Sequence, residues 1–236
     1  MIISYLNTFL IGIVVIPLFI VAAVILIIVS LFARPILFWV APYLSRLMLF
    51  LLRVKLKTAG HFPENGPYII MANHSSFIDI FLIPSVIKGR FTAVAAKFNY
   101  RYPVYAQLLK SFRIIPIDRY NRSNAFRGIK IAETLIRKKG YHVVILPEGT
   151  RTLTGKMGKL KKGGFHMAVN TSTPILPIGI RGAYDYKPQD RKTIEPGEVS
   201  IRIGELIDPN QYDDLGMEGL MARVESDLKE LSGEAI

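Results

Sequence analysis

The chain has 236 residues, which suits one sizeable domain with an additional segment, and half of its residues are hydrophobic. It contains no cysteine, which excludes disulfide bonds, thiolate catalysis and cysteine-ligated metals. Its net charge of +12 indicates an anionic partner or surface.

The charge is unevenly distributed along the chain. Residues 1–63 hold five basic and no acidic residues, residues 64–204 hold 23 basic and nine acidic ones, and residues 205–236 hold two basic and nine acidic ones. A basic central region behind an apolar N-terminus indicates binding to anionic phospholipid, to a phosphate-bearing substrate, or to both. Nucleic acid would also explain the basicity, but the apolar segment favours a membrane surface, and we expect no nucleic-acid partner.

The N-terminal segment contains two apolar stretches. Residues 2–33 are uncharged and would form a helix of about 48 Å, which exceeds the ~30 Å hydrocarbon core of a bilayer. An Arg-Pro pair interrupts the run, and residues 36–52 form a second, amphipathic stretch. We therefore expect a membrane-embedded helix pair in residues 1–53 and a second domain in residues 54–236. Whether the first helix spans the bilayer or the pair enters one leaflet stays open; if it spans, the following basic residues place the second domain on the cytoplasmic side of the inner membrane.

From residue 54 onward, short apolar runs alternate with longer mixed segments, which is typical of an α/β domain. Strands are predicted at residues 54–58, 68–72, 91–96, 114–117, 143–146, 174–180 and 199–203. Helices are predicted at residues 76–86, 103–109, 124–138, 165–170 and 217–231. The alternation predicts a mixed, mostly parallel sheet flanked by helices.

His74 follows the predicted strand 68–72, and Asp79 lies five residues further along. A histidine with an orienting carboxylate is what a general base needs, but five residues along one continuous helix would place the two side chains about 140° apart. They can meet only if His74 lies on the turn and Asp79 in the first helical turn, which Ser75 or Ser76 would cap. The same residues also fit a capping box, in which Asp79 only satisfies the helix start.

Further polar residues follow other predicted strands. Asp118 and Arg119 follow one strand, residues 148–151 (Glu-Gly-Thr-Arg) follow another, and Lys97 follows a third. In α/β sheets, ligand sites gather where strands end and loops meet. Together with the histidine and aspartate described above, these clusters indicate one site for anion binding and proton transfer.

Residues 73–79 (Asn-His-Ser-Ser-Phe-Ile-Asp) resemble the first motif of the glycerolipid acyltransferases, a histidine and an aspartate separated by four residues. Residues 97–103 resemble the family's lysine segment, although that segment usually has an acidic residue near position 99. The second, third and fourth motifs of the family are similar to residues 115–119, 147–151 and 175–180, respectively. The motifs occur in family order. Within the family, the chain looks most like the bacterial enzymes that acylate 1-acyl-sn-glycerol 3-phosphate.

The resemblance implies transfer of a fatty acyl group from acyl-CoA or acyl-acyl carrier protein to the sn-2 hydroxyl of lysophosphatidic acid, giving phosphatidic acid at an anionic phospholipid membrane. His74 would be the general base, and Asp79 would hold its ring and stabilise the imidazolium. Arg151 and Arg119 would bind the acceptor phosphate through paired hydrogen bonds. The same phosphate site would include Glu148, Gly149, Thr150 and Lys97.

Several of these roles stay open. Arg119 could form only a salt bridge to Asp118. Glu148 could position Arg151 or accept a hydrogen bond from the glycerol, and Lys97 could line the basic pocket or face the membrane. Residues 155–164 form a basic, glycine-rich loop, whose four lysines are expected to face lipid headgroups; they are Lys156, Lys159, Lys161 and Lys162.

Other functions compete with this one. A different lysolipid acceptor, such as a lyso-ornithine lipid, fits the same motifs. A serine hydrolase with Ser75 or Ser76 as nucleophile is disfavoured, because neither serine lies in a Gly-x-Ser-x-Gly elbow. A non-enzymatic protein that docks on anionic membranes would not explain the polar clusters at strand ends. No metal-ligand spacing is visible, so we expect neither a metal nor a cofactor, and we expect structural roles for His61, His142 and His166.

Overall fold

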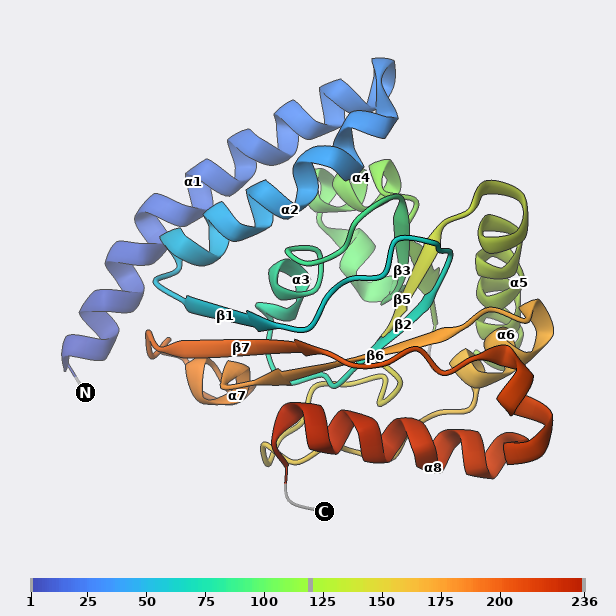
Figure 1. Ribbon diagram of the computed structural model, residues 1–236. Helices are drawn as coiled ribbons and strands as arrows, with labels where there is room; N and C mark the ends of the chain where they lie inside the picture. Colours follow the sequence, from blue (N-terminus) through green and yellow to red (C-terminus); the bar gives the residue numbers. More distant parts are fainter. Residues whose placement is uncertain (1, 119–120, 235–236) are drawn as a thin grey trace.

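The computed structural model describes residues 2–118 and 121–234. In this part of the chain, seven strands form one sheet with helices on both faces (Figure 1). The strands are β1 (Lys55–Ala59), β2 (Ile69–Ala72), β3 (Phe91–Ala96), β4 (Ile115–Ile117), β5 (His142–Ile145), β6 (Ile175–Arg181) and β7 (Glu198–Ile203). The order in the sheet is β1-β7-β6-β2-β5-β3-β4.

Only one neighbouring pair in this order, β6 and β7, is antiparallel. The five strands from β6 to β4 run parallel to one another, and β1 runs parallel to β7. The sheet is therefore mixed and mostly parallel, which confirms the predicted fold class.

The longer helices are α1 (Ile2–Phe32), α2 (Arg34–Leu51), α4 (Pro103–Ser111), α5 (Arg122–Lys139), α6 (Gly163–Thr171) and α8 (Tyr212–Ser232). Shorter pieces are α3 (Asp79–Leu82), α7 (Ala183–Tyr186), η1 (Lys97–Arg101) and η2 (Pro209–Gln211). Figure 1 shows α1 and α2 on one side of the sheet and α8 on the opposite side.

Two predicted helices differ from the structure. The helix expected at 76–86 is reduced to α3, which ends at Leu82, because Pro84 has no N–H to donate to a carbonyl of the preceding turn. The C-terminal helix begins five residues earlier than expected, at Tyr212, and has a kink at Gly216, where φ is +60°. A positive φ suits glycine and marks the kink.

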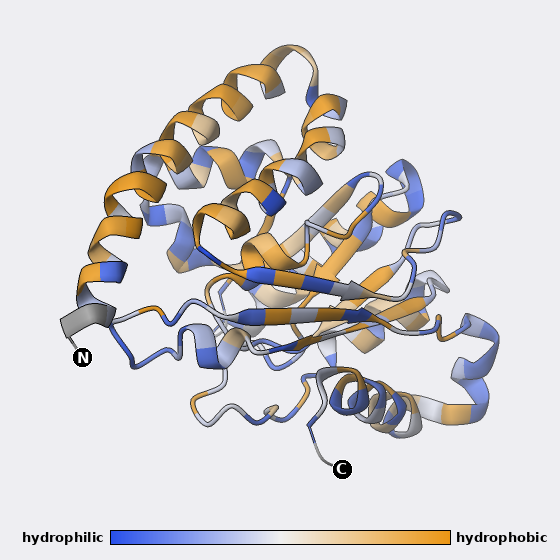
Figure 2. Cartoon of the chain, turned by 60° about the vertical axis from the view of Figure 1, so that its left-hand side comes forward, coloured by the Kyte–Doolittle hydropathy of each residue, from blue (hydrophilic) through white to orange (hydrophobic). Residues whose placement is uncertain are grey.

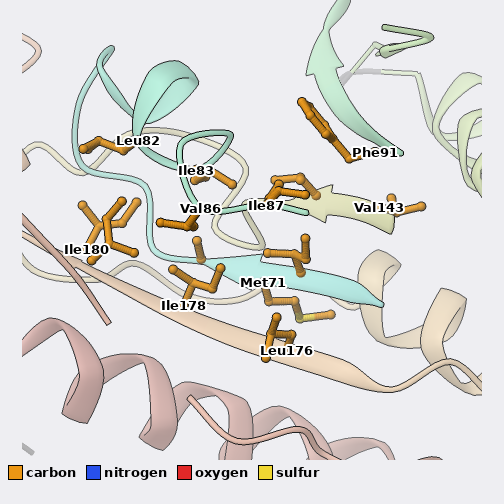
Figure 3. Packing of buried hydrophobic residues seen from close by; sticks show 14 of the residues in the cluster. Met71, Leu82, Ile83, Val86, Ile87, Phe91, Val143, Leu176, Ile178 and Ile180 are labelled. Atoms are coloured by element: carbon orange, nitrogen blue, oxygen red, sulfur yellow. The ribbon is translucent and has the colours of Figure 1, made fainter. Parts of the chain in front are cut away.

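The core lies on both faces of the central strands. All four residues of β2 are buried, which a strand covered by helices on both sides requires. Figure 3 shows Met71 of β2 between the neighbouring strands β6 and β5, with Leu176 and Ile178 on β6 and Val143 on β5; all four belong to the buried apolar cluster. The buried strand β2 therefore fixes the position of Asn73, the residue that follows its last strand residue.

Helices α1 and α2 form an antiparallel pair that packs on the rest of the chain. The Phe38 ring of α2 meets the rings of Phe91, Phe112 and Tyr141 edge-on, at centroid distances of 5.7, 5.6 and 5.5 Å. Helix α1 packs against α4, where the hydroxyls of Ser30 and Ser111 lie 2.9 Å apart. The inner side of the pair therefore shares the core of the sheet.

The outer side of this pair is apolar and exposed. Figure 2 shows α1 as hydrophobic over almost its whole length. The exposed fractions are 63% for Phe9, 86% for Phe32 and 71% for Trp39. Both helices are long and apolar enough to cross a membrane, by length and composition. An apolar surface of this extent is unfavourable in water and is typical of an interaction site.

Candidate active site

Three polar segments meet at one edge of the sheet. The parallel strands β2, β5 and β3 end at the same edge, and each is followed by one of the predicted clusters. His74 follows β2, Glu148 follows β5 and Lys97 follows β3. The topology therefore brings together residues that are more than 20 positions apart in the chain.

His74 and Asp79 are in direct contact. The His74 Nδ1 atom lies 2.8 Å from Oδ2 of Asp79, and the Asp79 side chain is only 1% exposed. The same carboxylate oxygen accepts from the backbone N–H groups of Ser75 (2.9 Å) and Ser76 (3.0 Å). Asp79 thus closes the turn as in a capping box and also holds the imidazole. A carboxylate at Nδ1 keeps the proton on that nitrogen, which leaves Nε2 of the neutral ring free to accept another.

Asn73 anchors this turn to the neighbouring strand. Its Nδ2 donates to the carbonyl oxygen of Ile180 (2.8 Å), and its Oδ1 accepts from the N–H of the same residue (2.7 Å). The side chain continues the pairing of β2 with β6 beyond the last strand residue. Sequence reasoning did not assign a role to Asn73, since its partner is 107 residues away.

The loop after β5 forms hydrogen bonds with both the backbone N–H and the backbone carbonyl of His74. Glu148 Oε1 accepts from the His74 N–H (2.8 Å), and the N–H of Thr152 donates to the His74 carbonyl (2.9 Å). Glu148 Oε2 accepts from the N–H of Gly158 (2.6 Å). Burial raises the pKa of the Glu148 carboxyl, while the N–H groups of Gly158 and His74 oppose the rise. Glu148 therefore joins the histidine turn to the basic loop.

Cations surround this turn. Arg151 is half-buried and has no hydrogen bond or ion pair with the other described residues. Lys187, which the sequence did not single out, has a pKa lowered by burial and by the neighbouring cations Arg151 and Arg191. Its carbonyl accepts from the Ser76 hydroxyl (2.9 Å), which ties this segment to the histidine turn.

The other predicted phosphate contacts lie around the same edge. Lys97 is exposed at the start of η1, and Thr150 is exposed beside Arg151. Gly149 lines the cavity described next. Arg119 lies outside the described residues.

A cavity of about 540 Å³ opens beside His74 and Asp79. Its remaining walls are mainly apolar and come from α1, α2, α4, β3 and α6; examples are Phe19, Met48, Leu108, Val94 and Met167. Ligand cavities commonly measure roughly 300–1,000 Å³ and carry a few polar groups on an apolar wall. This one can hold an apolar chain with its polar end at the histidine.

The neighbouring serines have other partners. The Ser76 hydroxyl donates to Lys187, and the Ser75 hydroxyl accepts from Nδ2 of Asn73 (3.2 Å). In the described part of the chain, neither hydroxyl forms a hydrogen bond with the His74 ring, so the geometry offers no activated serine nucleophile. Over the same residues, no group of three or more His, Asp or Glu could hold a metal ion.

The remaining histidines lie away from this edge or on the surface. His61 and His166 are exposed. His142 is buried and accepts from the Tyr68 N–H at Nδ1 (3.0 Å). Burial lowers the pKa of His142 to about 4, so the ring is neutral near pH 7 and acts as an internal acceptor.

Known proteins are similar to this chain in sequence. Residues 53–181 match the family model described as Acyltransferase. The chain is 30% identical over 170 residues to a 1-acyl-sn-glycerol-3-phosphate acyltransferase of Cocos nucifera, covering 72% of this chain and 55% of the relative. A Pseudomonas aeruginosa protein of the same name is 30% identical over 153 residues, covering 65% and 58%.

The fold is also similar to a solved structure. The crystal structure of the 1-acyl-sn-glycerophosphate (LPA) acyltransferase PlsC from Thermotoga maritima aligns with a TM-score of 0.84 at 25% identity, covering 99% of this chain and 97% of that one. The chain spans about half the length of the curated relatives it matches. Because the family model matches more than half of its residues, the chain belongs to the acyltransferase family.

Proposed function

We propose that the protein transfers a fatty acyl group from an acyl-CoA or acyl-acyl carrier protein thioester to the sn-2 hydroxyl of 1-acyl-sn-glycerol 3-phosphate, giving phosphatidic acid. The observation that carries this proposal is the His74–Asp79 pair on the wall of a largely apolar cavity, with the unpaired Arg151 nearby. The names of the relatives support the same acceptor.

The residues fit direct transfer without an acyl-enzyme. Nε2 of His74 takes the proton of the acceptor hydroxyl as its oxygen attacks the thioester carbonyl carbon, and the carbonyl electrons move to the oxygen. Asp79 stabilises the imidazolium that forms. When the carbon–sulfur bond breaks, the electrons return, the imidazolium gives its proton to the departing thiolate, and His74 is neutral again. The cavity accommodates the acyl chain during these steps.

Arg151 is assigned to the acceptor phosphate, because a guanidinium makes paired hydrogen bonds to phosphate oxygens and this one has no hydrogen bond or ion pair with the other described residues. Lys97 and Thr150 complete the polar surroundings in this proposal, and Arg119, outside the described residues, stays a predicted phosphate contact. Glu148 differs: its two oxygens accept from backbone N–H groups of two separate segments, and a carboxylate repels phosphate. We assign it to positioning the loop.

Arg151→Lys is expected to lower kcat/KM for lysophosphatidate about ten- to a hundredfold. The lysine keeps the charge but loses the planar, two-pronged donor geometry of the guanidinium. A charge-assisted hydrogen bond contributes roughly 1.5–3 kcal/mol to binding, and about 1.4 kcal/mol corresponds to a tenfold change in kcat/KM. The loss should lie in acceptor binding, with little change in the KM of the donor. Steady-state kinetics with lysophosphatidate and with an acceptor that lacks the phosphate measures this. Equal losses on both acceptors would assign Arg151 a structural role instead.

Residues 1–53 form, in this proposal, a membrane motif that brings the site to its lipid substrates at the cytoplasmic face of the inner membrane, where the positive charge favours anionic phospholipid. Deleting the motif is an unsuitable test, because Phe38 packs against Phe91 and Phe112 in the shared core. Substitutions on the exposed face of α1 avoid this problem.

The variant Phe9→Asp/Ile13→Asp/Ile16→Asp is expected to lose most of its partitioning into vesicles. The three side chains are 63%, 55% and 61% exposed on one face of α1, and each Asp costs roughly 2.5–3.5 kcal/mol near the centre of a membrane helix. Sedimentation with vesicles measures the bound fraction, and circular dichroism checks the fold. The parent should stay bound in high salt, since apolar burial is not screened. Release of the parent by salt alone would contradict insertion of these helices into lipid.

The proposed reaction is tested by offering the purified full-length protein a panel of lysolipids with each thioester donor and identifying the products by mass spectrometry. Phosphatidate formed from lysophosphatidate, at rates well above those for lyso-ornithine lipid and uncharged lysolipids, is the expected result. A preference for a lysolipid without phosphate would replace the acceptor, and no transfer with any pair would contradict the function.

A further inference from the structure

We infer that Lys161 is a further catalytic residue, whose ammonium stabilises the negative charge that develops on the thioester carbonyl oxygen. This inference rests on the proposed acyl transfer. It differs from the expectation that the lysines of residues 155–164 only face lipid headgroups.

Lys161 is the one lysine or arginine among the described residues that line the cavity of His74 and Asp79. The reacting carbonyl must lie within reach of His74, while its acyl chain occupies the apolar part of that cavity. A cation on the same wall is therefore on the side where the carbonyl oxygen gains charge. Arg151 does not line this cavity, which leaves it to the acceptor phosphate.

The loop holds Lys161 in this place through its backbone. The Lys161 N–H donates to the carbonyl of Pro147 (2.8 Å), and Gly158, three residues earlier, donates to Glu148. Leu160 is 4% exposed and anchors the loop in the core. The carboxylate of Glu148 also holds the His74 N–H, so one side chain sets the positions of both the base and the cation-bearing loop.

Gly149 supplies the space that the lysine side chain occupies. A Cβ added at Gly149 would lie 2.6 Å from Nζ, 3.1 Å from Cε and 3.2 Å from Cδ of Lys161. The lysine chain therefore passes directly over this glycine, whose φ of +73° also favours glycine. The Lys161 ammonium has no carboxylate partner within the described residues, so its charge is available to a substrate oxygen.

The oxyanion exists only during the reaction, so this contact should affect turnover more than binding. Lys161→Ala is expected to lower kcat about a hundredfold, as loss of one oxyanion donor does elsewhere, with the KM of lysophosphatidate little changed. Lys162→Ala is the matched control, because Lys162 is the next residue in the loop but does not line the cavity; it should keep kcat within about twofold.

A double-mutant cycle tests the contact with Gly149. Gly149→Ala should displace the ammonium and lower kcat, and the same change in a Lys161→Ala background should cost much less, because the displaced group is already absent. Losses that simply multiply would overturn the assigned contact. Circular dichroism and thermal unfolding establish that each variant is folded.

The outcomes separate this inference from the proposed function. Parent-like kcat in Lys161→Ala, or a loss confined to the KM of the acceptor, would overturn the oxyanion role while acyl transfer stands. Absence of acyl transfer in both the parent and Lys162→Ala would overturn the proposed function and this inference together.

Discussion

His74→Ala is expected to lower the rate of acyl transfer by about a hundred- to ten-thousandfold, the range that a positioned general base contributes. The substitution removes the only imidazole that lines the cavity in the described part of the chain. The fold should persist, because the His74 N–H and carbonyl, which bond to Glu148 and Thr152, belong to the backbone. Initial rates with saturating lysophosphatidate and donor measure the effect.

His166→Ala serves as the control for this experiment, since His166 is an exposed histidine of α6 that does not line the cavity. It should retain parent activity, and both variants should partition into vesicles as the parent does. Comparable losses in the two histidine variants would point to general destabilisation, and retention of most activity in His74→Ala would remove this residue from the chemistry.

Asp79→Asn is expected to lower kcat about a hundredfold or more. One oxygen of Asp79 accepts from His74 and from the Ser75 and Ser76 N–H groups, so an asparagine keeps its oxygen there. Its NH2 group then takes the buried position of Oδ1, which has no hydrogen-bond partner in the described part of the chain. Losing a charge-assisted bond costs roughly 1.5–3 kcal/mol, and an unpaired buried donor adds about 1–3 kcal/mol.

Circular dichroism distinguishes lost catalysis from a disturbed fold, because Asp79→Asn should keep the parent spectrum while kcat falls. Near-parent turnover would mean that Asp79 serves only to cap the turn, through the Ser75 and Ser76 N–H groups.

Local patterns were sufficient to predict the sheet. The four-residue run of β2 is apolar throughout because both faces of the sheet are covered, and such runs are recognised without knowledge of their partners. Strand β7 has a different local signature, the alternation of polar and apolar residues in Glu-Val-Ser-Ile-Arg-Ile. The contact of His74 with Asp79 also follows from a short spacing, once the turn and helix start are assigned.

Features that depend on distant residues were not predictable in this way. Asn73 bonds to Ile180, and no local pattern indicates this partner. Lys161 was expected on a headgroup-facing surface and is exposed, but no local pattern indicates that the backbone bond of its loop to Pro147 also places it on the cavity wall. Helix α3 is shorter than its helix propensity suggests for two reasons. Asp79 closes the preceding turn with its side chain, and Pro84 lacks the N–H that would continue the helix.

His74, oriented by Asp79, is expected to drive transfer of an acyl group from a thioester to lysophosphatidate. The most direct measurement gives purified parent and His74→Ala protein a thioester with an isotope-labelled acyl group and 1-acyl-sn-glycerol 3-phosphate, and then locates the label by mass spectrometry. The parent should place the label at the sn-2 position of phosphatidate, and His74→Ala should leave it on the donor. Labelled free fatty acid as the main product, or equal labelling of phosphatidate by both proteins, would contradict the account.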